Sequence, residues 1–422
     1  MLKLGQRACT HFKFPSNTSR ISRFQSTKTN ASELVEEERL PFYSHDQFYP
    51  VRIGEVLDSS FKVIGKLGYG AYSTVWLCRD MRDIWQRNAG FDADYVAVKI
   101  CTRDAENSAQ LNRELNFYEH ASSMESRHRG SAYIRGLYGE FKLDGPTGNH
   151  WCLVHPPMHM TIRQFQYQNL ARKLTVPLLK WTLTNVLRAL SFLHDVAKVV
   201  HTDINPANIM LTLADKSILE DFEKAEAENP SLSKVIDDTR TIYRSRKLDL
   251  PTGDLWGQSV LCDFGEARIG DSHSGLIQPK QYRAPEILFE MEWGSKVDIW
   301  SVAMLVWDLF ENQYLFDARD NEGKSSATHH VSEMVAYLGM PPLQYTQSND
   351  ITKKVFDKQG QWTGGSKSVT IPKISLEERI TVLEGKEKEL FLDFIRSMLR
   401  WRPEDRMSAT ELLKHPWMAD SM

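Results

Sequence analysis

Two short runs in the second half of the chain carry side chains of the types and spacing that phosphoryl transfer requires. Asp203 and Asn208 lie five positions apart, and Asp263 opens the later run Asp263-Phe-Gly265. Phosphoryl transfer needs an aspartate to orient the attacking hydroxyl group, and an amide oxygen and a second aspartate to hold Mg²⁺. Asp203 fits the first role, and Asn208 and Asp263 fit the metal-binding roles. Any single aspartate is more often a helix cap or a surface charge, so this prediction depends on the features that accompany the three residues.

A glycine-rich run precedes them near the start of the chain, and it reads Gly68-Tyr-Gly70-Ala-Tyr-Ser73-Thr-Val75. Glycine has no Cβ, so backbone N–H groups there can close over phosphates. Such a hairpin is also common as an ordinary turn, and Ser73 stands where the nucleotide-binding pattern has its third glycine. The run alone is therefore a weak signal.

A lysine on a strand strengthens that signal. Lys99 ends the run Val96-Ala-Val-Lys99, about thirty residues beyond the glycines, where its charge can neutralise the α- and β-phosphates of a nucleotide if a carboxylate fixes its direction. Glu114 and Glu119 both lie in the predicted helix that follows. Either could be that partner on spacing alone.

The elements that must position these residues form an α+β fold. Short β-branched runs predict antiparallel strands in the first part of the chain, at 61–64, 74–78, 95–100 and 151–154, with one helix at 108–120. Beyond Met158 apolar residues recur at i+3 and i+4, which predicts a mainly helical second part; the clearest stripe is Leu179, Leu183, Val186, Leu187, Leu190 and Leu193.

Two segments depart from this pattern. Residues 215–258 are highly charged and predict an insertion that is partly helical and otherwise mobile, with a solvated linker as the simpler interpretation. Residues 1–32 contain no Asp or Glu but several Lys and Arg among many Ser and Thr, so we define 1–40 as a basic Ser/Thr-rich tail. This composition is typical of a mitochondrial transit peptide, and a disordered basic tail is the alternative.

The overall composition excludes several classes of function. The 422 residues carry a formal net charge of −3, which provides no basic field for nucleic acid. No apolar run is long enough to span a bilayer, so no membrane role is expected. The five cysteines have no CxxC spacing, which indicates a reducing compartment without structural disulfides or zinc; they are Cys9, Cys78, Cys101, Cys152 and Cys262.

The ordered series of motifs resembles the eukaryotic protein kinase family from Leu67 to Trp417. It continues after Asp263 with Ala284-Pro-Glu286, Asp298-Ile-Trp300 and the run 401–406. The resemblance implies a bilobal kinase fold, with a lead-in segment at 41–60, an N-lobe at 61–157 and a C-lobe at 158–418 that contains the insertion. It also implies a buried ion pair between Glu286 and Arg406.

The same resemblance implies ATP and Mg²⁺ as cofactors and favours Glu114 over Glu119. The implied catalytic residues are Lys99, Glu114, Asp203, Asn208 and Asp263, of which Asn208 and Asp263 would bind the metal. The implied nucleotide-binding residues are Leu67, Gly68, Gly70, Ser73, Val75, Ala97, Lys99, Pro156 and Met158. At the hinge, Pro156 keeps a carbonyl and Met158 keeps an N–H group, so adenine can still be bound. Cys262 is expected to border the same pocket as a small buried side chain.

Further motifs resemble the SR-protein kinase branch of the CMGC group in a divergent, fungal-type form. They are Phe48–Gly54, Lys66–Leu77, His201-Thr-Asp-Ile204, Tyr282-Arg283 and the insertion. This implies a monomeric Ser/Thr kinase acting on protein substrates, with Arg/Ser-rich splicing factors as candidates, in cytoplasm and nucleus. The basic tail adds the mitochondrion as an alternative location.

Three departures from the branch qualify these expectations. Thr202 replaces an arginine that collects an activation-loop phosphate in many relatives, which predicts activity without loop phosphorylation. Asn205 replaces a lysine that contacts the γ-phosphate, which predicts slow turnover. The segment 318–330 carries Lys324, His329 and His330, which dilute the acidity of the substrate-docking groove.

Two other functions are compatible with these departures. An ATP-binding pseudokinase that acts as a scaffold is supported by Ser73 and Asn205 alone, whereas every residue that supplies base or metal ligand is present. Tyrosine-kinase activity is less favoured, because Asn205-Pro-Ala-Asn208 lacks the Ala/Arg arrangement of that group.

Overall fold

The computed structural model describes residues 33–83, 94–103, 109–124, 126–253 and 255–419. The chain forms two compact units, which are described separately. Unit 1 comprises residues 1–106, 137–157 and 213–257, and unit 2 comprises 107–136, 158–212 and 258–422. One stretch of unit 1 ends at Pro157, whereas the helix after Lys99 groups with unit 2 and the insertion groups with unit 1.

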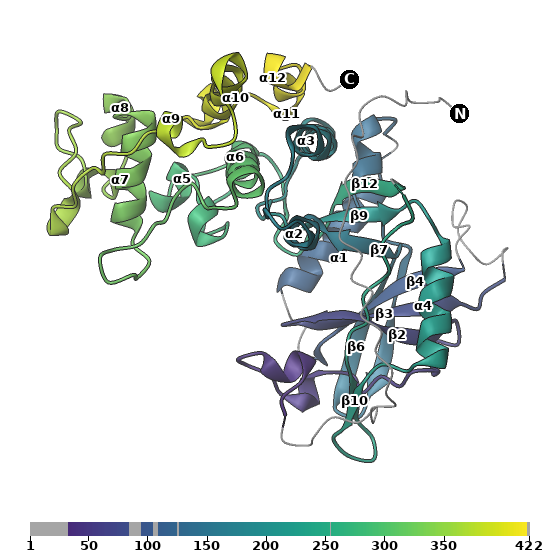
Figure 1. Ribbon diagram of the computed structural model, residues 1–422. Helices are drawn as coiled ribbons and strands as arrows, with labels where there is room; N and C mark the ends of the chain where they lie inside the picture. The colour runs from purple at the N-terminus through teal and green to yellow at the C-terminus, as the bar shows by residue number, and fades with distance from the viewer. Residues whose placement is uncertain (1–32, 84–93, 104–108, 125, 254, 420–422) are drawn as a thin grey trace. The chain divides into compact units, whose positions relative to one another are not determined.

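Unit 1 is built on an antiparallel sheet of six strands (Figure 1), as the alternating sequence pattern predicted. Its strand order is β1-β2-β3-β4-β6-β5. The strands are β1 (Val56–Leu57), β2 (Phe61–Gly70), β3 (Ser73–Asp80), β4 (Tyr95–Cys101), β5 (Gly139–Gly145) and β6 (Gly148–His155). β-branched and aromatic side chains, among them Val63, Trp76 and Val98, form a continuous buried core on one face. This core gives the glycine-rich hairpin β2–β3 a rigid base.

The insertion is ordered and lies in unit 1, which differs from its predicted place within the second lobe. It forms α4 (Ser217–Glu228) and a hairpin of β10 (Ser233–Val235) with β11 (Thr241–Tyr243). Figure 1 shows α4 lying alongside the strands of unit 1. Although most residues of α4 are charged or polar, the helix has an apolar face made of Ile218, Leu219 and Phe222. These three side chains are buried against Ile64, Leu77 and their neighbours in the sheet.

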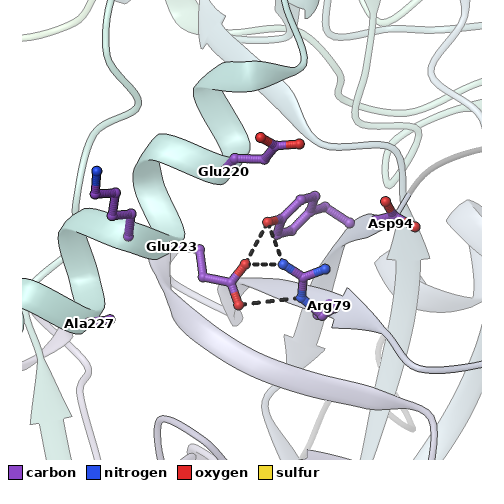
Figure 2. Close-up of a pocket in the computed structure, with 7 residues that line it drawn as sticks. Arg79, Asp94, Glu220, Glu223 and Ala227 are labelled. Carbon is purple, nitrogen blue, oxygen red and sulfur yellow. Dashed lines mark hydrogen bonds and ion pairs between the residues drawn. The ribbon is translucent and has the colours of Figure 1, made fainter.

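Two local features let α4 pack closely on the sheet. At Gly65 of β2, a Cβ atom would lie 2.9 Å from Cε1 of Phe222, so any larger residue would push the helix outward. Beside this contact, Glu223 of α4 binds Arg79 of β3 and accepts a hydrogen bond of 2.5 Å from the hydroxyl of Tyr95 (Figure 2). A shallow hollow of about 400 Å³ lies over this cluster, between the helix and the strands.

The end of the predicted basic tail also belongs to unit 1. Residues 1–32, which carry the composition of a transit peptide, and Cys9 lie outside the described residues. Residues 33–40 are described, and their short 3₁₀ helix η1 (Glu36–Arg39) packs with Val35 and Glu37 buried. Residues 33–40 of the predicted tail are therefore part of unit 1.

Unit 2 is mainly helical, as predicted. Its helices are α1 (Ala109–Ser122), α2 (Ile162–Gln168), α3 (Val176–Ser191), α5 (Pro285–Leu288), α6 (Lys296–Glu311), α7 (Ala327–Leu338), α8 (Leu343–Thr346), α9 (Leu376–Arg379), α10 (Gly385–Met398), α11 (Ala409–Leu412) and α12 (Pro416–Ala419). The apolar stripe of Leu179 to Leu193 is buried along α3 and the turn after it. Within the described ranges, no helix is both long and apolar enough to cross a membrane.

Short strands of unit 2 carry the loops of chemical interest. A three-stranded sheet has the order β12-β9-β7, made of β12 (Trp256–Leu261), β9 (Ile209–Leu213) and β7 (Met158–Thr161). A separate pair joins β8 (Val199–Val200) to β13 (Arg268–Ile269). The run from His201 to Asn208 connects β8 to β9, and Asp263 lies two residues after the end of β12. Cys78, Cys101, Cys152 and Cys262 are all buried thiols.

Candidate active site

A buried carboxylate organises the loop that carries Asp203. Asp298 of α6 is fully buried and accepts hydrogen bonds from the backbone N–H groups of His201 (2.8 Å) and Thr202 (2.7 Å). Its Oδ2 also lies 2.8 Å from Nε2 of His194. Several hydrogen bonds from N–H groups offset the free-energy cost of burying the charged carboxylate. The same bonds fix the backbone that donates them. These bonds therefore hold the loop that carries Asp203 in one conformation.

The imidazole of His201 links this loop to the Asp263 segment. Its Nδ1 accepts the backbone N–H of Asp203 at 3.2 Å, and its Nε2 lies 3.1 Å from the carbonyl oxygen of Cys262. Since a carbonyl only accepts, Nε2 carries the proton and Nδ1 the lone pair. The side chain is fully buried and packs edge-on against the ring of Phe264 at 5.0 Å. His201 thus fixes Asp203 and Asp263 relative to each other.

The carboxylate of Asp203 is held by two amide side chains. Nδ2 of Asn205 donates to Oδ1 at 2.9 Å, and Nδ2 of Asn208 donates to Oδ2 at 2.7 Å. The residue is partly exposed, and each oxygen keeps a further lone pair for a hydroxyl group. Asn205, which the sequence analysis treated as a lost contact, is therefore a donor that orients Asp203.

The two predicted metal ligands carry oxygen atoms of the right kind. Because Asn208 donates through Nδ2, its amide oxygen remains available, and its backbone carbonyl accepts the N–H of Cys262 at 2.8 Å. Asp263 is exposed, has a left-handed φ of 64° and accepts the N–H of Gly265 at 3.3 Å. Carboxylate and amide oxygens suit Mg²⁺, which keeps several other ligands from water and phosphate. The donor set fits a magnesium site.

Helix α1 is joined to the Asp263 segment by aromatic stacking and by hydrogen bonds. The ring of Phe264 stacks on that of Phe117 with centroids 3.7 Å apart. Nε of Arg113 donates to the carbonyl of Gly265 at 2.7 Å. In the same helix Glu114 is buried and lies 3.4 Å from the guanidinium of Arg135, whereas Glu119 is exposed. Burial next to this segment supports Glu114 as the functional carboxylate of the two.

The predicted nucleotide-binding residues of unit 1, apart from Pro156, lie on the β2–β3–β4 part of the sheet. Lys99 is in β4, where it pairs with Val75 of β3. Gly70 pairs with Ser73 across the hairpin turn. A Cβ added at Gly68 or Gly70 would meet no atom within 4 Å, so the space next to the loop is open. The remaining positions are Leu67 in β2, Ala97 in β4 and Pro156 directly after β6.

The residue after Pro156 and Pro157 contributes to a buried apolar cluster in unit 2. Met158, Val260 and Cys262 form this cluster, and Met210 packs against it. Burial raises the pKa of the Cys262 thiol to about 11, so this side chain is neutral and acts as a small buried apolar group.

The segment between Asp263 and Glu286 is held by polar contacts to the protein itself. Thr202 has a left-handed φ of 72°, and its hydroxyl donates to the carbonyl of Glu266 at 2.8 Å. Gln278 has a φ of 66°; its side-chain amide donates to the carbonyl of Val297 (2.9 Å) and its oxygen accepts the N–H of Ala284 (2.9 Å). These left-handed residues need such bonds to offset their backbone strain.

The predicted ion pair of Glu286 and Arg406 is confirmed. Two parallel bonds of 2.6 Å join the carboxylate to the guanidinium, and both side chains are at most 1% exposed. The remaining N–H groups of Arg406 donate to the carbonyls of Arg400 and Lys296, each at 3.0 Å. The pair fixes the end of the segment that follows Asp263.

The segment 318–330 is less basic at its surface than its sequence indicates. His330 is buried against the ring of Phe316, and burial lowers its pKa to about 3, so it is neutral. Lys324 forms an exposed ion pair of 2.7 Å with Glu322. Nδ1 of His329 contacts the hydroxyl of Ser326 at the start of α7. The expected dilution by His330 is therefore wrong, because a buried imidazole adds no surface charge.

Sequence reasoning assigned no role to His201, Asp298 or Gln278, although the first two lie in quoted motifs. Their signal was the motif itself: a His two positions before Asp203, and the Asp that opens the run Asp298-Ile-Trp300. Gln278 had no signal, because a glutamine in a loop is ordinary until its backbone conformation is known.

Comparisons with known proteins agree with this geometry. A family model described as the protein kinase domain matches residues 61–244 and 255–418. A serine/threonine protein kinase from Aspergillus fumigatus is 42% identical over 385 residues, covering 91% of each chain. A serine/threonine-protein kinase SRPK from Physarum polycephalum is 26% identical over 91% of this chain and 92% of its own, and SRSF protein kinase 3 from Homo sapiens is 22% identical over 92% and 91%.

The fold has a solved counterpart as well. A crystal structure of a kinase domain matches with a TM-score of 0.63 at 22% identity, covering 89% of this chain and 100% of its own. With a matching family model, a relative of 42% identity and a site built on Asp203, Asn208 and Asp263, this chain belongs to the protein kinase family and is similar to its SR-protein kinase members.

Proposed function

We propose that this protein is an active Ser/Thr protein kinase that transfers the γ-phosphoryl group of ATP to protein hydroxyl groups. The observation that carries the proposal is the Asp203 carboxylate, which two amide donors hold while it keeps lone pairs for a substrate hydroxyl. Phosphoryl transfer depends on positioning and charge stabilisation, so a fixed carboxylate next to metal-binding oxygens is the arrangement it needs. The 42% identical relative is named a serine/threonine protein kinase.

ATP and Mg²⁺ are the cofactors we assign. Asn208 and Asp263 would hold Mg²⁺, which supplies charge neutralisation at the phosphates when bound. Lys99 would contact the phosphates and Glu114 would orient it. The glycine-rich loop around Gly68 and Gly70 would cover the phosphates with its backbone N–H groups.

A pseudokinase that binds nucleotide but serves as a scaffold is the second candidate. Asn205 supports it, because the γ-phosphate then lacks the contact that a lysine would give. The hydrogen bond from Asn205 to Asp203 opposes it, since a residue that orients the base is of use to an enzyme and of none to a scaffold.

The substrates we propose are serines next to arginine in extended, basic segments. The similarity to SRPK proteins supports this class, as does the neutral His330. Within the segment, Glu322 forms an ion pair with Lys324, which neutralises part of its acidity, and Arg319 pairs with the preceding Asp317. We therefore expect docking of Arg/Ser repeats to be weak.

Three peptides of equal length test the proposed function with labelled ATP and Mg²⁺: an Arg-Ser repeat, the same peptide with Lys for each Arg, and the same peptide with Tyr for each Ser. We expect phosphoserine in the first, less label in the second because ammonium groups lack the planar fork of guanidinium, and none in the third. A full-length protein that labels no peptide and no basic protein would establish the scaffold instead.

We further propose that activity does not depend on phosphorylation of the segment after Asp263. The hydroxyl of Thr202 and the amide of Gln278 make the contacts that hold this segment, where relatives use an arginine and a phosphate. Phosphatase treatment of the purified enzyme should leave its rate unchanged, and Gln278→Ala should lower the rate equally before and after treatment. A large loss on phosphatase treatment of the parent protein would contradict this.

A further inference from the structure

One lysine of the glycine-rich hairpin is fully buried, and the proposed chemistry does not use it. Lys66 of β2 stands two residues before Gly68 and has no exposed surface. Its Nζ donates to Oε2 of Glu37 and to the carbonyl of Tyr243 (3.2 Å), and it lies 3.8 Å from Oε2 of Glu36. A buried ammonium group is stable only with such compensation. The charge of Lys66 thus fixes β2 to two segments distant in sequence.

The carboxylate that binds Lys66 lies on residues 33–40, which we call the N-terminal strap. The strap is attached to the insertion on its other side. Lys234 of β10 donates to both carboxylate oxygens of Glu38 at 2.9 and 3.0 Å, and the hydroxyl of Ser245 donates to Glu36 at 2.6 Å. Since Lys234 and Glu38 are both almost completely buried, the strap has one defined position on unit 1.

The backbone of β2 is held at the same place. The carbonyl of Lys66 accepts the N–H of Arg246 from the insertion at 2.9 Å. The preceding Gly65 lies under the ring of Phe222. The regular pairing of β2 with β3 shifts between Lys66 and Gly68, and beyond that shift Gly68 and Gly70 face open space. The fixed part of the hairpin ends where the glycine-rich loop begins.

We propose that Glu37 and Lys66 are positioning residues for nucleotide binding, which hold the base of the glycine-rich loop so that its N–H groups are aimed at the phosphates. The inference rests on the proposed ATP-dependent function. Preorganised donors bind a ligand without an ordering cost, so a loosened base lowers ATP affinity and leaves the chemistry at Asp203 unaffected. A merely structural pair would lower stability without this selectivity.

The test compares full-length variants for binding of a fluorescent ATP analogue with Mg²⁺, for KM and kcat, and for Tm without nucleotide. Glu37→Gln removes the charge, and Glu37→Asp keeps it but shortens the reach. Asp80→Asn is the matched control, because Asp80 is equally buried and pairs with Arg82 at 2.7 Å, at the opposite end of the same hairpin. The reciprocal variant Glu37→Lys with Lys66→Glu restores opposite charges.

We expect both Glu37 variants to raise the Kd and KM for ATP about tenfold with kcat within about twofold, as loss of ground-state binding requires. Asp80→Asn should lower Tm by a similar amount but keep the parent affinity, and the reciprocal variant should recover most of the lost affinity. Unchanged ATP affinity in the Glu37 variants, or an equal loss in Asp80→Asn, would overturn the inference. A parent protein that binds no nucleotide would overturn the proposed function and the inference with it.

Discussion

Replacing Asp203 by alanine is expected to lower kcat for peptide phosphorylation by about 10²–10⁴-fold, the range for loss of a positioned acid–base group. Asp203 is held by Asn205 and Asn208 and keeps lone pairs for the incoming hydroxyl, so alanine leaves the nucleophile without direction. Neither proposed metal ligand is changed. The Kd for a Mg²⁺–ATP analogue should therefore stay within about threefold of the parent value, because only the reacting step loses an interaction.

Asp350→Ala is the matched control for this experiment, since its side chain is 97% exposed and lies in a different part of unit 2. Its kcat should equal that of the parent protein. If Asp203→Ala retained full activity, the label would have to come from another kinase or another residue, and the assignment of Asp203 would be wrong.

Replacing Glu286 by glutamine is expected to have the largest effect on stability, about 3–5 kcal/mol of unfolding free energy, because it leaves a buried guanidinium without its counter-charge. Arg406 is completely buried, and its other contacts are neutral: two carbonyl groups and the ring of Trp300. For a unit of this size, such a loss corresponds to a fall in Tm on the order of 10 °C. Circular dichroism at 222 nm would follow the helices of unit 2 directly.

The control is the exposed pair of Arg402 and Asp405, at 2.7 Å and only a few residues from Arg406. Asp405→Asn should not change Tm measurably, because solvent screens an exposed pair. A Glu286→Gln protein that melts within a degree of the parent would mean that the ion pair adds nothing to the stability of unit 2. Refolding yield after heating would then separate equilibrium from kinetic effects.

The sequence alone predicted the strands and loops whose local structure depends on a short stretch of neighbouring residues. The strands around Val63, Trp76 and Val98 follow from β-branched and aromatic residues between turns. The loop from His201 to Asn208 and the run at Asp263 kept their motif spacing, and the structure brings Asp203, Asn208 and Cys262 into hydrogen-bonded contact. Local propensity and motif spacing are both readable without the fold.

The contacts that sequence reasoning missed all join segments that are distant in the chain. The apolar face of α4 consists of three side chains in a mainly acidic helix. Phe222 can pack against β2 because Gly65, about 150 residues earlier in the chain, has no side chain. A lysine such as Lys66 is ordinarily expected at the surface, and the sequence does not show that Glu37 binds it in the interior. From the sequence, His330 was expected to add positive charge to the segment, but its burial keeps the imidazole neutral. Burial and pairing of this kind depend on tertiary packing, which a single sequence does not display.

The discontinuous course of unit 1 also determines when that unit can fold during synthesis. Its sheet is made of residues that leave the ribosome early, but Phe222, Leu248 and Tyr243 complete its core and come from the insertion, after a long stretch of unit 2 has been made. Until about residue 257 has emerged, Ile64 and Leu77 remain uncovered and the edge near Lys66 lacks its cover. Long-range closure of this kind is slow and leaves apolar surface exposed. The nascent first half of the chain therefore keeps apolar strand residues exposed until the insertion has been made.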